Sequence, residues 1–301
     1  MISTHRKTSS FIIAFFGALL FSTKAVFIKM AYWYDIDKLS LLVLRMGFAL
    51  PFYILFAIYQ SQRKKVQKQK IAKKDWALLI TLGIIGYYFA SYLDMWGLKF
   101  ISAGMERLIL FAYPTITTIL AAVIFRQKLK KNTILSIILT YLGISLAFWD
   151  KTSLSNNVDF WQGAILVFGS ALTFSCFLIG SEKLIPRIGS MRFTSYSMIV
   201  SCLITIIHFG IQNNQDILEF PWQVYTIAMG IATISTVIPS FMMSYAIKNI
   251  GASNTAITSS VGPIWVLILA YFILDESFST LQIAGTLIVI VGVWLISRAK
   301  K

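Results

Sequence analysis

The chain contains ten stretches of mostly apolar residues, each about 20 residues long, and this feature restricts it to a membrane fold. A helix needs about 20 apolar residues to cross a hydrocarbon core about 30 Å thick, at about 1.5 Å per residue. The connections between the stretches are short, so no separate soluble domain fits. The stretches cover residues 10–31, 38–59, 76–98, 102–125, 132–149, 160–180, 193–211, 222–247, 253–273 and 279–297.

Composition excludes the other broad classes of protein. Hydrophobic residues make up 57% of the 301 residues and charged residues 13%, which leaves too little polar surface for a soluble fold and too much hydrophobicity for disorder. Two cysteines, Cys176 and Cys202, and two histidines are too few for a disulfide scaffold or most structural zinc sites. We therefore expect neither a metal nor a cofactor.

The first apolar stretch follows His5, Arg6 and Lys7, which is how a signal peptide begins. The stretch is long enough to cross the membrane, and it is not followed by a cleavage site of small residues and a polar sequence, as a signal peptide is. We therefore expect the stretch to remain in the protein as its first helix.

The positive charges alternate between the two sides of the ten stretches. The net charge is +15, which in a membrane protein is typical of basic cytoplasmic loops rather than of nucleic-acid binding. The segments 60–75, 126–131, 183–192 and 298–301 are rich in Lys and Arg, and ten spans place all of them on the side of the N-terminus. The opposite connections carry most of the acids. The sequence thus predicts a multi-pass protein of the cytoplasmic (inner) membrane with both termini in the cytoplasm.

The chain also repeats itself. Residues 96–149 align without gaps to residues 245–298 at an offset of 149, with eleven of 54 pairs identical, including the mid-helix prolines Pro114 and Pro263. A weaker match pairs 18–22 with 171–175. Each repeat then holds five helices, residues 1–150 and 151–301. Because five is odd, the second copy crosses the membrane in the inverted sense, an architecture used by transporters.

Two segments carry a resemblance to a known family. Gly97-Leu-Lys-Phe-Ile-Ser-Ala-Gly104 leads to Tyr113-Pro114, and Ala246-Ile-Lys-Asn-Ile-Gly-Ala-Ser253 leads to Gly262-Pro263. This pattern resembles the EamA-type proteins of the drug/metabolite transporter superfamily. The resemblance implies ten spans in two five-helix halves and transport of amino acids or other small metabolites, often outward. In the family an acid usually follows the fourth and the ninth span. This chain keeps the acid after the ninth span as Glu276 but has Gln127 after the fourth, which indicates that the acid is not required in the first half.

Charged residues inside the spans are candidates for the transport site, because each costs at least about 2.5–3.5 kcal/mol at mid-helix. Lys24 lies deep in the first span and Arg45 in the second. Both can face a cavity, where they favour an anionic group such as a substrate carboxylate. The alternative is an interhelical ion pair, or snorkelling of the long side chains to the interface.

A second group of charges lies near the ends of the third and fourth spans. Asp94 and Arg107 are expected to pair, because buried charges usually do. Glu106 is then left as a candidate for proton coupling, since an acid in a partly dry cavity can bind and release a proton. Asp94, Glu106 and Arg107 together form a predicted coupling site or outer gate.

Aromatic residues suggest where the body of a substrate lies. Tyr88, Tyr92 and Trp96 share one face of the third span, and Trp265 follows Pro263. We take Tyr88, Tyr92 and Trp265 as candidate substrate contacts, with a packing face or interfacial belt as the alternative. Pro114 and Pro263 are candidate hinges or static kinks.

The function that these features favour is that of a secondary transporter that exports amino acids or similar small metabolites by alternating access. A small-molecule channel and a membrane-embedded enzyme are the alternatives, but the chain lacks catalytic and phosphate-binding motifs, so we expect no enzyme. The expected partners are a small carboxylate-bearing substrate and the lipid bilayer, not nucleic acid. The protein is expected to be a monomer or a homodimer.

The predicted topology can be tested by labelling. Single cysteines at Ser61 and Asn156, in a background without Cys176 and Cys202, are expected to react with an impermeant thiol reagent from opposite sides of the membrane. Equal labelling of both positions from outside would contradict the ten-span topology.

Overall fold

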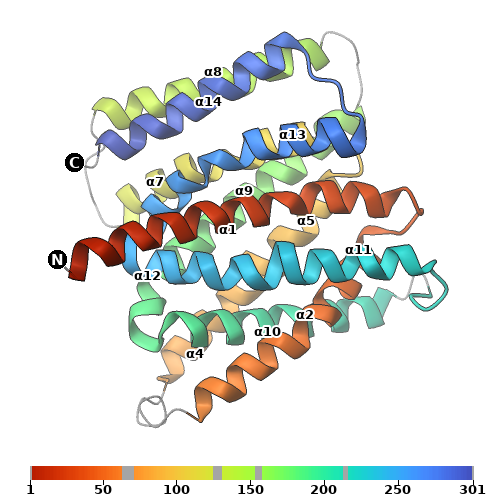
Figure 1. Cartoon of the computed structure of the whole chain (residues 1–301), viewed down its shortest axis with the longest axis vertical. Coiled ribbons are helices and arrows are strands. Elements are labelled where there is room, and N and C mark those ends of the chain that lie inside the picture. Colours follow the sequence, from red (N-terminus) through yellow and green to blue (C-terminus); the bar gives the residue numbers. More distant parts are fainter. Residues whose placement is uncertain (1, 63–70, 125–130, 153–157, 213–215, 300–301) are drawn as a thin grey trace.

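A computed structural model of the chain describes residues 2–62, 71–124, 131–152, 158–212 and 216–299 (Figure 1). Over these ranges the regular structure is helical, without strands. Both chain ends lie at the same edge of the molecule in Figure 1. The helices are α1 (Ile2–Tyr32), α2 (Lys38–Ser61), α4 (Lys73–Leu82), η1 (Gly83–Phe89), α5 (Ala90–Gly97), α6 (Ala103–Leu110), α7 (Tyr113–Ile124), α8 (Lys131–Thr152), α9 (Val158–Ile188), α10 (Ser190–Gln212), α11 (Trp222–Ala232), η2 (Thr233–Val237), α12 (Ile238–Thr258), η3 (Ser259–Val261), α13 (Gly262–Leu274) and α14 (Thr280–Ala299).

The helices account for the ten spans. Seven described helical segments are long and apolar enough to cross a membrane, and three shorter apolar helices cover Ile137–Ala147, Val261–Leu274 and Thr280–Gly292. One long segment, Trp222–Thr258, bends at Gly251, where φ is +82°. Only glycine adopts this backbone conformation readily, and the bend separates the eighth span from the ninth. The prediction of an all-α membrane protein with ten spans in two repeats is therefore confirmed.

The sixth span differs from its prediction at one end. It was expected to stop near residue 180, before a basic loop, but α9 continues to Ile188 and only Gly189, with φ +88°, separates it from α10. Lys183 and Arg187 therefore lie on the last turns of a helix rather than in a loop. Charges end an apolar run without ending a helix, because their side chains extend toward water while the backbone stays helical.

Matching irregularities occur in the two halves. The π-helical segment η1 covers Gly83–Phe89, and η2 covers Thr233–Val237, which corresponds to residues 84–88 at the offset of 149. The helix of the fourth span breaks after Leu110, and the ninth span has the short 3₁₀ segment η3 at the equivalent place. The two repeats thus share local backbone distortions as well as their order of helices.

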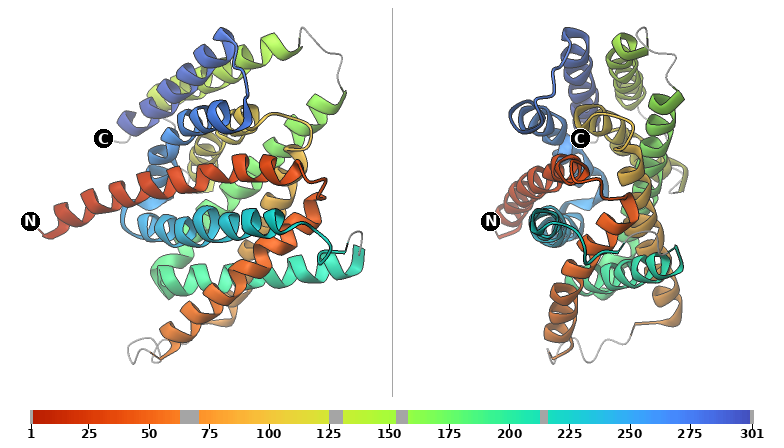
Figure 2. Two further views of the ribbon diagram at one scale, coloured as in Figure 1. Left: turned by 45° about the vertical axis from the view of Figure 1, so that its right-hand side comes forward. Right: turned by 90° about the vertical axis from the view of Figure 1, so that its right-hand side faces the viewer.

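Two helices form a closely packed pair at one edge of the bundle. Figures 1 and 2 show α8 and α14 lying side by side beyond α7 and α13. A Cβ atom on Gly143 would lie 2.6 Å from the carbonyl oxygen of Gly285, and one on Gly285 would lie 2.4 Å from that of Gly143. Glycine at both positions lets the backbones approach, as in many membrane helix pairs.

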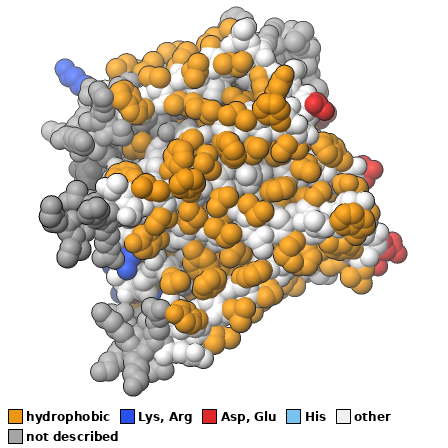
Figure 3. Space-filling view, viewed as in Figure 1, with side chains coloured by type: hydrophobic (Ala, Val, Ile, Leu, Met, Phe, Trp, Pro, Cys, Tyr) orange, Lys and Arg blue, Asp and Glu red, His pale blue; other side chains and the backbone are white. Residues whose placement is uncertain are grey.

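The surface is divided by charge. In Figure 3 the acidic side chains lie at one edge of the apolar surface and Lys and Arg at the opposite edge. We call the edge where α1 ends and α2 begins the acidic side, and the opposite edge the N-terminal side. The basic segments 63–70 and 125–130 lie outside the described residues, so the orientation of the protein in the membrane remains a prediction.

The α8–α14 contact predicts a difference between two glycine substitutions. Gly143→Ala is expected to destabilise the protein by about 1–3 kcal/mol, because the added methyl group overlaps the facing backbone. Gly47→Ala is the matched control, since a Cβ atom there meets nothing within 4 Å. Thermal unfolding of both variants in detergent measures the difference, and an unchanged melting temperature for Gly143→Ala would contradict the close contact.

Candidate functional site

A buried ion pair links the first and third spans. The Lys24 Nζ atom on α1 lies 2.6 Å from Asp94 Oδ2 on α5, and the two side chains are 5% and 1% exposed. The sequence suggested Arg107 as the partner of Asp94, so this pairing is a correction. The helix that carries Lys24 also contacts α5 through the Tyr32 hydroxyl group, which donates to the Met95 carbonyl oxygen at 2.6 Å, whereas Arg107 bonds to Ser22.

Two acids lie together in this buried cluster. Glu106 on α6 is fully buried, and its carboxyl group is close enough to that of Asp94 for a hydrogen bond when one of the two carries a proton. The positive charges of Lys24, Arg107 and Lys29 act on Glu106. Two adjacent carboxylates repel each other strongly in a medium without water, so this arrangement is suited to holding a proton.

Arg107 connects the first and second halves. Its Nη2 atom donates a 2.5 Å hydrogen bond to Ser22 Oγ, and Ser22 in turn donates to the carbonyl oxygen of Ala18 at 2.6 Å. Gly262 of the second half lies against the same group, because a Cβ atom there would be 2.7 Å from both Arg107 Nη2 and Ser22 Oγ. Glycine at position 262 therefore makes room for the guanidinium group.

Arg45 is the remaining buried cation. It lies on α2, is 1% exposed, and donates from Nε to Thr236 Oγ1 on η2 at 2.8 Å. Its Nη1 atom has no hydrogen-bond partner among the described residues. A buried donor without a partner is costly, so the position requires an explanation.

A cavity lies between the two halves and has two adjoining chambers. Phe21, Tyr87, Tyr113 and Phe174 line both. The polar chamber adds four side chains that carry charge or a hydroxyl group: Lys24, Arg45, Ser91 and Ser170. The apolar chamber extends toward the N-terminal side and adds, among others, Arg107, Phe177, Ser240, Met243, Ser244 and Ser259. The cavity is therefore cationic at one end, with Lys24 and Arg45, and mostly apolar at the other, where Arg107 is the charged residue.

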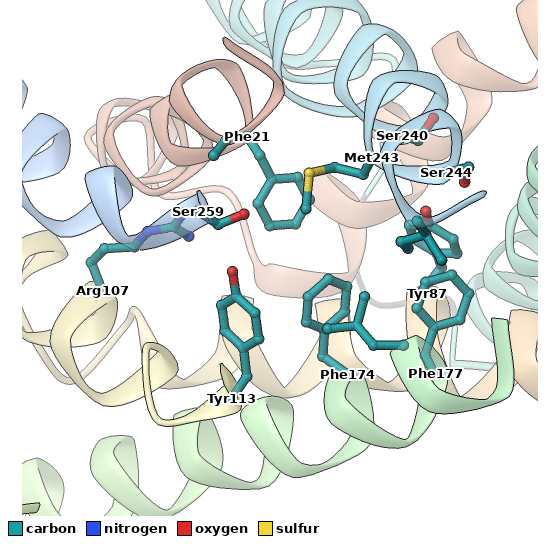
Figure 4. Close-up of a pocket in the computed structure, with 13 residues that line it drawn as sticks. Phe21, Tyr87, Arg107, Tyr113, Phe174, Phe177, Ser240, Met243, Ser244 and Ser259 are labelled. Atoms are coloured by element: carbon teal, nitrogen blue, oxygen red, sulfur yellow. The ribbon is translucent and has the colours of Figure 1, made fainter. Parts of the chain in front are cut away.

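Aromatic rings from both repeats form the walls of the apolar chamber (Figure 4). Phe21 and Phe174, which match in the weaker repeat at an offset of 153, stack with centroids 6.0 Å apart and an interplanar angle of 17°. Tyr113 meets Phe174 edge-on at 5.3 Å, and its hydroxyl group points toward Ser259 and Arg107. The chamber thus presents a flat apolar wall with a polar group at one edge.

The aromatic residues chosen from the sequence lie elsewhere. Tyr88 and Tyr92 stack on each other outside both chambers, and the Tyr88 hydroxyl group lies 2.7 Å from His208 Nδ1 on α10. Trp265 is half buried on α13 and lines neither chamber. Lys24 and Arg45, in contrast, are brought to one chamber, as the sequence suggested.

The two prolines occupy equivalent places in broken spans. Pro114 is the second residue of α7 and Pro263 the second residue of α13, each directly after a break in its span. Proline is well tolerated in the first turn of a helix, where its missing N–H would have no partner. Each of the two spans thus consists of two helical pieces joined at the level of the cavity.

The acidic side of the cavity is closed by a contact between the halves. Glu276, which follows α13, accepts hydrogen bonds from the backbone N–H groups of Ala103 at 2.8 Å and Gly104 at 3.2 Å. A carboxylate at a helix N-terminus is stabilised by the exposed backbone donors there. The acid of the second repeat thus caps α6 of the first.

Comparisons with known proteins agree with this architecture. The model of the EamA-like transporter family matches residues 8–149 and 161–298. The chain belongs to the EamA-like transporter family. "Uncharacterized transporter YcbK" of Bacillus subtilis (strain 168) is 27% identical over 276 residues, which cover 89% of this chain and 86% of that protein. "WAT1-related protein At1g68170" of Arabidopsis thaliana is 21% identical, with 91% and 85% covered.

A solved structure described only as "Crystal structure of protein" matches with a TM-score of 0.70 and 13% identity, and the match covers 97% of each chain. At this identity the likeness shows the fold alone. The family and its relatives, two of which are named transporters of Bacillus subtilis, establish that this EamA-like protein is a membrane transporter and not an enzyme.

Several cavity residues of this EamA-like transporter were missed from the sequence. Tyr87 lies next to Tyr88 but faces the cavity, and Tyr113 directly precedes Pro114. Phe21 and Phe174 were contained in the weaker repeat of 18–22 with 171–175, so the repeat itself held the signal. An aromatic residue beside a paired break, or repeated between the halves, is thus better evidence for a cavity than a stripe of rings on one helix.

The Lys24–Asp94 pair predicts a pattern of stability. Asp94→Asn is expected to lower stability by about 3 kcal/mol, because removing one partner leaves a buried ammonium group without its counter-charge. The double variant Lys24→Met with Asp94→Asn removes both charges and is expected to recover much of the loss. Melting temperatures in detergent measure both, and wild-type stability of the single variant would contradict the buried pair.

Proposed function

We propose that the protein is a secondary transporter that exports small carboxylate-bearing metabolites, amino acids among them, by alternating access. The observation that carries the proposal is the central cavity, which is built from both halves, cationic at one end and aromatic at the other. A saturable carrier needs one such site between two parts that move relative to each other.

The cavity favours an amphipathic anion. Lys24, Arg45 and Arg107 give the site positive charge, and charged groups away from water are stabilised by a bound counter-ion. The rings of Phe21 and Phe174 offer flat apolar surface for the rest of the molecule. Convergent polar groups beside an apolar wall are typical of small-molecule sites.

The broken spans support alternating access. The breaks before Pro114 and Pro263 lie at equivalent positions, and each allows one helical piece to move relative to the other. The cap from Glu276 to Ala103 and Gly104 holds the halves together on the acidic side. Opening that side would break this cap, while the N-terminal side closes over the apolar chamber.

Proton coupling belongs to the same proposal. Asp94 and Glu106 lie together beside Lys24, so one proton shared by the two acids lowers their repulsion. Exposure of this pair to the acidic side during opening would let the proton exchange with water. We place the protein in the cytoplasmic membrane, with both termini cytoplasmic, as a monomer or homodimer.

Counterflow tests the carrier. Proteoliposomes preloaded with an unlabelled aromatic amino acid are expected to accumulate the same labelled compound transiently, because a carrier exchanges solutes across one alternating site. The uptake rate is expected to saturate. Linear uptake without counterflow would contradict a carrier and favour a channel.

Proton coupling is tested by an imposed pH gradient. The gradient is expected to change the rate of transport by wild-type protein, and Glu106→Gln is expected to abolish the response while keeping counterflow, because the amide neither binds nor releases a proton. Wild-type transport that ignores the gradient would contradict this role for Glu106.

A further inference from the structure

The three buried cations of the cavity differ in how their charge is balanced. Lys24 lies 2.6 Å from Asp94, so its charge is already compensated by a contact. Arg107 donates to the Ser22 hydroxyl group, which carries no charge. Arg45 donates from Nε to the Thr236 hydroxyl group, which likewise carries no charge.

The buried cluster has more positive than negative charges. In the state without the proton that the two acids share, three cations, Lys24, Arg45 and Arg107, face two ionised carboxyl groups, Asp94 and Glu106, so one positive charge is left over. A buried charge without a counter-charge is strongly unfavourable. Of the three cations, only Lys24 forms an ion pair among the described residues, whereas Arg45 and Arg107 bond to hydroxyl groups, and of these two Arg45 is the one that shares the polar chamber with Lys24.

The position of Arg45 suits an anchor for a ligand. Its side chain is 1% exposed, lines the polar chamber, and has a free donor at Nη1. The Nε–Thr236 bond holds the guanidinium group in place from the π-helical segment η2. Ser91 and Ser170 line the same chamber and carry further hydroxyl groups.

Arginine is the side chain best matched to a carboxylate, because its planar donors bind both oxygens at once. We propose that Arg45, and not Lys24, binds the carboxylate of the substrate, and that the site is built for one negative charge. This inference rests on the proposed transport function and specifies its substrate class as monoanions. The apolar body then lies against the rings of Phe21 and Phe174, which line both chambers.

A second negative charge has no place in this arrangement. Lys24 is already paired with Asp94, Arg107 in the apolar chamber already donates to Ser22, and the other walls beyond Arg45 are mostly apolar. A dicarboxylate would therefore bring its second carboxylate against an apolar wall, or displace a group that a cation already holds, Asp94 at Lys24 or Ser22 at Arg107. Both are costly, so the site is expected to select monocarboxylates over dicarboxylates of similar size.

Ligand-induced thermal shifts of the purified protein test the assignment. The probes are 3-phenylpropanoate, its uncharged amide 3-phenylpropanamide, and the dicarboxylate 2-phenylsuccinate. The wild type is expected to be stabilised by the monocarboxylate at concentrations at least about tenfold lower than by either of the other two. The amide cannot form the charge-assisted hydrogen bond, and the dicarboxylate carries a second charge without a counter-charge.

Four variants complete the test. Arg45→Gln is expected to weaken 3-phenylpropanoate binding at least about tenfold and to abolish the preference over the amide, and Arg45→Lys to give an intermediate loss. Arg187→Gln, which removes an exposed arginine paired with Asp75, is the matched control for the loss of one positive charge. The double variant Lys24→Met with Asp94→Asn removes the neighbouring ion pair.

The result that overturns the inference is retention of the carboxylate preference in Arg45→Gln, or an equal loss in the double variant. Failure of the inference is separable from failure of the transport proposal. Counterflow by the wild type with normal carboxylate preference in Arg45→Gln would leave the carrier in place and remove Arg45 as its anchor. Arg45→Gln is expected to fold, because the substitution removes an uncompensated buried charge rather than one member of an ion pair.

Discussion

The Lys24–Asp94 ion pair is the contact on which the polar end of the cavity depends. A charge in the hydrocarbon layer is tolerated only with a partner, and this pair fixes α1 against α5 while it keeps one cation and one acid away from lipid. Glu106 and Arg107 then join the pair from α6, and the resulting cluster lies beside the chamber that Arg45 lines. The chemistry of the site thus follows from how a few charges are balanced in a medium that does not solvate them.

The repeats explain why the cavity has two unlike ends. Lys24 corresponds to Phe177 at the offset of 153, and Asp94 to Met243 at the offset of 149. Phe177 and Met243 line the apolar chamber, as Lys24 lines the polar one. The same backbone positions therefore carry charge in the first half and apolar side chains in the second. An inverted repeat with different side chains gives one continuous site that is matched to an amphipathic molecule.

Much of this arrangement could be predicted from the sequence, and the failures have physical reasons. The spans and the repeat follow from apolar length and from paired residues such as Pro114 and Pro263, which depend on the local chain alone. The partner of Asp94 could not be predicted, because it depends on how α1 packs against α5 and α6. The choice of Tyr88 over Tyr87 failed for the same reason. A stripe of rings shows which side chains share a helix face, but not which helix or cavity that face meets. The π-helical turn at Gly83–Phe89 had no recognised signal, although it shapes the helix that carries both rings.

The central claim is that the cavity is one transport site reached from alternate sides, and cysteine accessibility measures it most directly. Ser91 lies in the polar chamber and Ser244 in the apolar chamber, so each can be replaced by a single cysteine in a Cys-free background. The account predicts that impermeant reagents reach Ser91→Cys only from the acidic side and Ser244→Cys only from the N-terminal side. It also predicts that conditions that increase one reactivity decrease the other. Simultaneous labelling of both positions from one side would contradict alternating access and indicate an open pore.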